Sequence, residues 1–221
     1  MINIAIDGPA GAGKSSLSRR LANELGYIYV DTGALYRAIG LKFSLLGYDT
    51  ALNCNISDVL RNTVVDIKFA DGVQKVFLDG EDVSDRIRTP DASMMASAVS
   101  AKSEVRAFLL DMQRHLAEKN DVVMDGRDIG TVVLPNADIK IFLTASAEIR
   151  ANRRFNELLE KNTAVSYEDV LADIQKRDYN DSHRSIAPLK KADDAILADT
   201  SALDFEESLK LLLQIVKDGT K

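Results

Sequence analysis

The chain has 221 residues, 46% of them hydrophobic, a length and composition that suit one α/β domain with insertions. Its formal net charge of −6 argues against a general nucleic-acid-binding surface. One cysteine, Cys54, and two histidines suggest neither an internal disulfide nor a zinc site, and no apolar run approaches the roughly 18–20 residues of a membrane span. We therefore expect a protein of the reducing cytoplasm, without nucleic-acid or membrane partners.

The first predicted strand, residues 2–7, runs into a glycine-rich turn that opens a helix at about Lys14. Gly8, Gly13, Lys14 and Ser15 fit the pattern G-x-x-x-x-G-K-[ST]. Glycines let backbone N–H groups approach a phosphate, and the helix directs its positive dipole end at the anion. We expect Lys14 to reach the β- and γ-phosphates and the Ser15 hydroxyl to ligate Mg²⁺. The predicted ATP-binding residues are Gly8, Pro9, Ala10, Gly11, Ala12, Gly13, Lys14, Ser15 and Ser16.

A second strand is predicted over residues 27–30, followed by a polar turn and another helix. Loops at the carboxyl ends of strands face the ligand crevice of an α/β sheet. Thr32 and Arg37 in this turn are therefore predicted to face the phosphate loop. Taken alone, Arg37 would be read as a solvated helix residue.

Residues 62–88 interrupt the alternation of strands and helices with two β-type runs, 64–69 and 74–78. Asp71-Gly72 between them is a hairpin signal, and a third short strand is predicted over 82–84. So small an antiparallel insert is marginal alone and must pack on the main body.

The residue pattern is helical again from near Asp91. Over 103–118, apolar residues at helical spacing form one stripe, which indicates a helix that faces the core. A third strand, 121–124, then ends in Asp125-Gly126-Arg127-Asp128. A loop that only turns the chain seldom needs an arginine, so we expect a functional role for Arg127. For Asp125, orientation of a magnesium-bound water and a structural role in the loop both stay open. Strands over 139–143 and 195–198 and a final helix capped by Asp204 complete the chain.

The segment 147–194 is polar and rich in arginine. Guanidinium forks suit oxyanions better than ammonium groups do, so we expect phosphate contacts here. The alternative is a solvated, charged helical surface. The arginines concerned are Arg150, Arg153, Arg154, Arg177 and Arg184.

This order of elements predicts a P-loop α/β fold with a five-stranded parallel sheet, a small β-insert and a helical lid. The predicted core comprises residues 1–31, 111–146 and 186–221. Residues 32–110, including the insert 62–88, would hold a phosphate acceptor, and residues 147–185 would form the lid. A lid that excludes water prevents wasteful hydrolysis and strengthens the electrostatics inside.

The chain resembles the bacterial cytidylate kinases, a family of P-loop nucleoside monophosphate kinases, from end to end. The stretches that carry the resemblance are residues 6–15, 31–37, 125–133, 177–178 and 185–189. Many families share the phosphate loop, whereas D-G-R-D-x-G-T-V-V and the β-insert are far more specific.

The resemblance implies transfer of the ATP γ-phosphoryl group to the 5′-phosphate of CMP or dCMP, with Mg²⁺ as cofactor. Ser97, Arg106 and Asp128 would read the cytosine, whose exocyclic amine donates to a carboxylate. Arg37, Arg127 and Arg184 would hold the CMP phosphate, and Thr32 and Asp181 would address the sugar. Arg177 would lie near the transferring group, so Lys14, Arg127 and Arg177 are the predicted catalytic residues. Arg150, Arg153 and Arg154 would be the phosphate contacts of the lid.

Three alternatives remain. The first is a P-loop kinase for another acceptor, UMP, AMP or TMP. The second is a nucleotide switch of the GTPase kind, against which the missing N-K-x-D signature counts. The third is a non-catalytic binding module, for which Lys14 and the arginines would be surplus. We expect a monomer.

Overall fold

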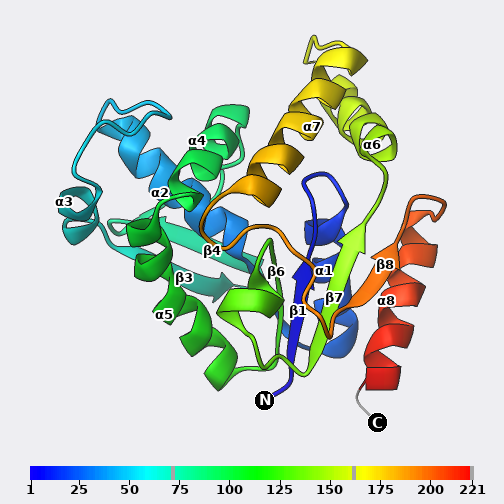
Figure 1. The fold of residues 1–221 in the computed structure, drawn as a ribbon. Coiled ribbons are helices and arrows are strands. Elements are labelled where there is room, and N and C mark those ends of the chain that lie inside the picture. The colour runs from blue at the N-terminus through cyan, green and yellow to red at the C-terminus, as the bar shows by residue number, and fades with distance from the viewer. Residues whose placement is uncertain (71–72, 161–162, 220–221) are drawn as a thin grey trace.

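A computed structural model describes residues 1–70, 73–160 and 163–219 and contains the predicted five-stranded sheet (Figure 1). The strand order is β2–β6–β1–β7–β8, and every pairing is parallel. The five strands are β1 (Asn3–Asp7), β2 (Ile28–Asp31), β6 (Val122–Gly126), β7 (Ile139–Thr144) and β8 (Ile196–Asp199).

Side chains alternate along each strand, so these apolar strands present hydrophobic side chains on both faces of the sheet. Helices cover both faces. One face carries Ile4, Ile6 and Ile141, which pack against α1 (Lys14–Leu25) and α8 (Phe205–Gly219). The other face packs against α5 (Ser103–Lys119) and against η1 (Ile129–Val133), a five-residue π-helix that the sequence did not predict. The strands are therefore held rigidly, with their carboxyl ends at one edge.

A second cluster of apolar side chains lies beside the sheet. It joins α2 (Thr32–Leu45), α4 (Pro90–Ser100), α5 and the short α3 (Ile56–Arg61), which was not predicted. At the contact of α2 with α4, a Cβ on Gly40 would lie only 2.8 Å from the Cβ of Met95. That close approach explains the glycine in mid-helix.

The predicted insert is a three-stranded antiparallel sheet of β3 (Val65–Ala70), β4 (Val73–Leu78) and β5 (Glu81–Asp82). Gln74 attaches it to the end of β2: its side chain accepts from Asp31 N (2.8 Å) and donates to Asp31 O (3.2 Å). The predicted hairpin turn at Asp71-Gly72 lies outside the described residues.

The third strand of the insert was predicted over 82–84, but it covers Glu81–Asp82, so its predicted end is two residues too far along and wrong. The ladder ends at Asp82 because Val76 N donates to the side chain of Ser84 and not to a backbone carbonyl of the next pair. The Ser84 Oγ accepts from Val76 N (3.0 Å) and donates to the Asp82 carboxylate (2.5 Å).

The arginine-rich segment forms two packed helices, α6 (Ala147–Glu160) and α7 (Tyr167–His183), as predicted. They stand above the phosphate loop at the carboxyl edge of the sheet (Figure 1). Their small shared core is built around Ala151, Val170 and Ile174. The division into core, acceptor region and lid stays a prediction. Within the described ranges, no helix is long and apolar enough to cross a membrane.

Candidate active site

The phosphate loop is shaped by glycines at two tight positions. Gly8 has φ 152°, and a Cβ there would lie 1.9 Å from the carbonyl oxygen of Leu143 on β7. Gly11 has φ 74°, and its Cβ would approach the Cβ of Arg150 to 3.3 Å. Neither position admits a side chain without strain, so the loop lies close against both the sheet and the lid.

Lys14 is the first residue of α1 and is almost fully buried. Its Nζ donates to the carbonyl oxygen of Pro9 within the same loop (2.7 Å). Burial, reinforced by the positive charge of Arg127, lowers the pKa of the Lys14 ammonium. An anion entering the loop would favour the charged form of this amine.

Asp125 lies at the centre of a hydrogen-bonded cluster at the end of β6. Its carboxylate accepts from the Ser15 hydroxyl (2.9 Å) and the Tyr29 hydroxyl (3.1 Å). Its backbone carbonyl accepts from the Thr32 hydroxyl (2.7 Å). Burial, followed by the nearby charge of Asp31, raises the pKa of this carboxyl.

This cluster fits a magnesium ion by the chemistry of its donors. Mg²⁺ prefers oxygen ligands and binds through few protein groups, with phosphates and waters completing the shell. The adjacent Ser15 hydroxyl and Asp125 carboxylate supply such oxygens. The described residues contain no group of three or more His, Cys, Asp or Glu that could form an all-protein metal cage.

Asp128 lies two residues after β6 and is buried, with 4% of its surface exposed. Its carboxylate is paired with Arg106 from α5 and accepts from Arg184, just after α7 (3.2 Å). Burial raises the pKa of this carboxyl, and the two arginines oppose that rise. The Arg106 guanidinium also lies 5.7 Å from the ring centre of Tyr36 on α2. Residues from α5 and from the end of α7, which are far apart in the sequence, thus meet at the Asp128 carboxylate.

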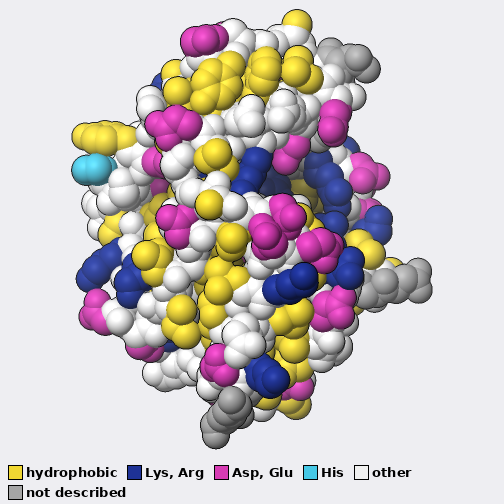
Figure 2. Space-filling model, turned by 90° about the vertical axis from the view of Figure 1, so that its right-hand side faces the viewer, with side chains coloured by type: hydrophobic (Ala, Val, Ile, Leu, Met, Phe, Trp, Pro, Cys, Tyr) yellow, Lys and Arg dark blue, Asp and Glu magenta, His cyan; other side chains and the backbone are white. Residues whose placement is uncertain are grey.

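Arg127 precedes Asp128 in the chain, and its charge acts on both Lys14 and Arg177. Arg127 Nε donates to the Asp181 carboxylate on α7 (2.8 Å). Burial lowers the pKa of the Arg177 guanidinium, and the charge of Arg127 lowers it further. Seen from the side of α6 and α8, Lys and Arg side chains gather in a hollow beneath the helical pair (Figure 2).

Arg37 lies on the first turns of α2, where it donates to the Asp31 carboxylate (2.8 Å). The same carboxylate caps the helix by accepting from Ala34 N (2.9 Å). The Nε of Arg37 is buried and has no hydrogen-bond partner within the described structure. A buried donor without a partner calls for an acceptor, and an anionic ligand would supply one. Ser97 lies half-buried on α4, the helix that packs on α2.

The three lid arginines have protein partners. Arg150, 4% exposed, donates to the Ala145 carbonyl (2.8 Å), the Ala10 carbonyl (2.9 Å) and both carboxylate oxygens of Asp178 (3.1 and 2.6 Å). Arg153 donates to the carbonyls of Thr200 (2.9 Å) and Leu203 (3.4 Å). Arg154 pairs with Glu157 on its own helix. The predicted phosphate contacts of these arginines stay a prediction.

Several site residues escaped the sequence analysis. Asp7, Tyr29, Asp31 and Asp178 carry contacts that hold the site together, but none of them was assigned a role. Asp7 and Asp31 each end a strand at the ligand edge, and that position was a usable signal. The partners of Tyr29 and Asp178 depend on packing between distant segments, which no local pattern reports.

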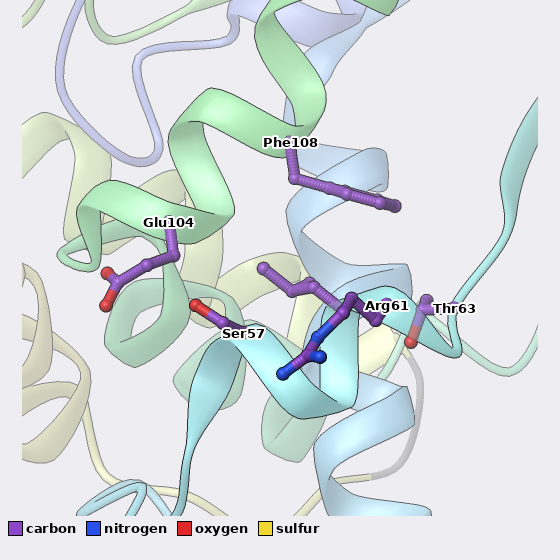
Figure 3. Close-up of a pocket in the computed structure, with 6 residues that line it drawn as sticks. Ser57, Arg61, Thr63, Glu104 and Phe108 are labelled. Carbon is purple, nitrogen blue, oxygen red and sulfur yellow. The ribbon is translucent and has the colours of Figure 1, made fainter.

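A cavity of about 420 Å³ lies away from this site, between α3 and α5 (Figure 3). Phe108 and Leu60 contribute apolar surface, and Arg61 at its rim is already paired with Asp58. None of the predicted site residues lines it. Its lining residues are Ser57, Leu60, Arg61, Thr63, Glu104 and Phe108.

Known proteins resemble this chain over nearly its whole length. Residues 4–218 match the family described as Cytidylate kinase. A cytidylate kinase of Caldicellulosiruptor bescii is 55% identical, with 97% of this chain and 95% of the relative covered. One from Carboxydothermus hydrogenoformans is 50% identical, with 97% of each covered. A crystal structure of an uncharacterized protein from Eubacterium ventriosum shares the fold alone, with TM-score 0.56 at 15% identity and 98% of each chain covered. On this agreement of sequence and site geometry, the chain belongs to the cytidylate kinase family.

Proposed function

We propose that this site transfers the γ-phosphoryl group of ATP to the 5′-phosphate of CMP or dCMP, giving ADP and CDP or dCDP. The observation that carries the proposal is the convergence of Lys14, Arg127 and Arg177 beside the buried, arginine-paired Asp128. Cations at the phosphate loop suit two sets of phosphates, and a buried carboxylate suits an exocyclic amine donor.

In this proposal the phosphate loop, residues 8–16, wraps the ATP phosphates with its backbone N–H groups. The CMP phosphate lies among Arg37, Arg127 and Arg184. Arg37 has a free buried Nε, which supports this assignment. Thr32 and Asp181 address the sugar; Asp181 is held by Arg127, so its oxygens are already oriented.

Asp128 accepts a hydrogen bond from the exocyclic amine of cytosine, with Arg106 and Ser97 beside it. Uracil presents a carbonyl oxygen at the same place, and two acceptors facing each other leave the buried carboxylate unpaired. An unsatisfied buried group typically costs about 1–3 kcal/mol, more when it is charged. This is enough for tenfold discrimination or better.

The reaction needs no general base, because the attacking oxygen belongs to a phosphate that is already ionised at neutral pH. Catalysis consists of in-line positioning and neutralisation of charge on the moving phosphoryl group. Lys14 and Arg177 supply that charge in a site from which the lid excludes water. Ser15, with Asp125 behind it, would hold Mg²⁺, which would neutralise part of the charge on the phosphates. This arrangement favours the magnesium-related reading of Asp125 that the sequence left open.

Product analysis tests the proposal directly. The protein is incubated with ATP, Mg²⁺ and one of CMP, dCMP, UMP, AMP or TMP, and nucleoside diphosphates are quantified. CDP and dCDP are expected to form fastest. Faster turnover of another monophosphate would favour the alternative kinase, and acceptor-independent ATP hydrolysis or no product would contradict phosphoryl transfer to a nucleotide.

A further inference from the structure

Asp7 is a buried acid for which the proposed reaction has no direct use. It is the last residue of β1, covalently joined to Gly8 of the phosphate loop, and is 4% exposed. Each of its carboxylate oxygens accepts one backbone N–H: Oδ1 from Ile129 (2.7 Å) and Oδ2 from Gly130 (2.8 Å). Both donors come from a segment more than 120 residues away in the chain.

Those two donors open the π-helix η1, which begins directly after Asp128. The side chain of Asp128 does not cap η1, because it is engaged by Arg106 and Arg184 instead. The first N–H groups of a helix need an acceptor. Asp7 supplies it from the strand that leads into the phosphate loop.

The fit at this junction is close. A Cβ on Gly130 would lie 3.4 Å from Oδ2 of Asp7 and 3.1 Å from Cδ of Lys140. A single π-helical turn is rare and is found mostly at functional sites. Burial raises the pKa of the Asp7 carboxyl to about 6, in spite of its two N–H donors. Burial thus opposes the charged form of Asp7, whereas the two N–H groups and the charge of Lys14 favour it.

We propose that Asp7 is a positioning residue that fixes where Asp128 lies relative to the phosphate loop. The acid that reads the base and the loop that binds the ATP phosphates are thereby held in one fixed arrangement. The inference rests on the proposed function, in which Asp128 reads the cytosine. One end of Asp7 is continuous with the loop that wraps the ATP phosphates. The other end holds the backbone that follows the base-reading acid.

Asp7→Asn is the test, because asparagine is nearly isosteric but keeps only one acceptor oxygen and turns an N–H₂ group toward the second backbone donor. The CMP-to-UMP ratio of kcat/KM is expected to fall about tenfold, while the KM for ATP changes less than about twofold. A role in stability alone would leave this ratio unchanged.

Asp121→Asn is the matched control. Asp121 also accepts a backbone N–H, from Ile2 at the opposite end of β1 (2.6 Å), and lies outside the site. We expect it to keep the wild-type ratio. Gly130→Ala provides a second perturbation of the same junction with Asp7 intact, and it is expected to lower the ratio as well. The second variant keeps the test decisive if Asp7→Asn does not fold.

The outcomes separate this inference from the proposed function. If the wild type shows no preference for CMP over UMP, the proposed function fails. If the wild type prefers CMP, and a folded Asp7→Asn or, failing that, Gly130→Ala retains the wild-type ratio, positioning by Asp7 is overturned and the proposed function stands.

Discussion

Replacement of Asp128 by asparagine examines base recognition at its centre. The substitution preserves shape but removes the charge that faces Arg106 and Arg184. Asp128 is 4% exposed, so a hydrogen bond from cytosine would form there without competition from water. A charge-assisted hydrogen bond in such surroundings contributes about 2–3 kcal/mol. At about 1.4 kcal/mol per factor of ten, kcat/KM for CMP should fall roughly 30- to 150-fold.

The assay compares steady-state kinetics with CMP and UMP at saturating ATP and Mg²⁺. The value for UMP should change little or rise, because the asparagine amide can donate to its carbonyl. Asp194→Asn is a suitable control, since Asp194 pairs with Lys140 (2.7 Å) outside the predicted site and its side chain is 65% exposed. A folded Asp128→Asn with the wild-type CMP-to-UMP ratio would refute the assignment of this acid.

Three further predictions concern charge and stability. Lys14→Met should lower kcat about 10²- to 10³-fold with folding intact, measured by initial rates and circular dichroism, because it removes a buried cation at the transferring phosphate. Asp178→Ala should lower the free energy of unfolding by about 3 kcal/mol in urea titrations, because it leaves Arg150 buried and unpaired. Asp7 has a raised pKa, so its stabilising contribution is present below pH 3.8 and is lost as the pH rises through about 6. Relative to Asp7→Asn, the wild type should therefore lose about 2 kcal/mol of stability between pH 4 and pH 7; parallel curves would contradict this.

The sequence was sufficient for the sheet and the phosphate loop, because both follow from local patterns. Apolar runs such as residues 2–7 and 139–143 are typical of strands buried on both faces, and the glycines at 8 and 13 restrict the turn that can follow. The resemblance to a known family extended the prediction to the acids and arginines of the site. Their roles toward the nucleotides remain predictions, which the variants above are designed to test.

Features that depend on distant partners could not be read from the chain. The π-helix at 129–133 has a β-branched sequence that favours a strand, and it forms where Asp7 accepts its first N–H groups. The partners of Arg150, Asp178 and Ala10, come from segments 28 and 140 residues away, and its predicted phosphate contact stays a prediction. Tertiary packing determines these features and overrides local propensity.

The hydrogen bond from Arg150 to the carbonyl of Ala10 has a mechanical consequence. It ties the start of α6 to the phosphate loop beneath it, whereas the end of α6 and the start of α7 lie at the far end of the helical pair (Figure 1). If the helical pair moves as a unit, we therefore expect it to pivot near Arg150. The largest displacement should then occur near Glu160 and Ser166. Amide exchange should accordingly be slow around Ala151 and fast toward that outer end.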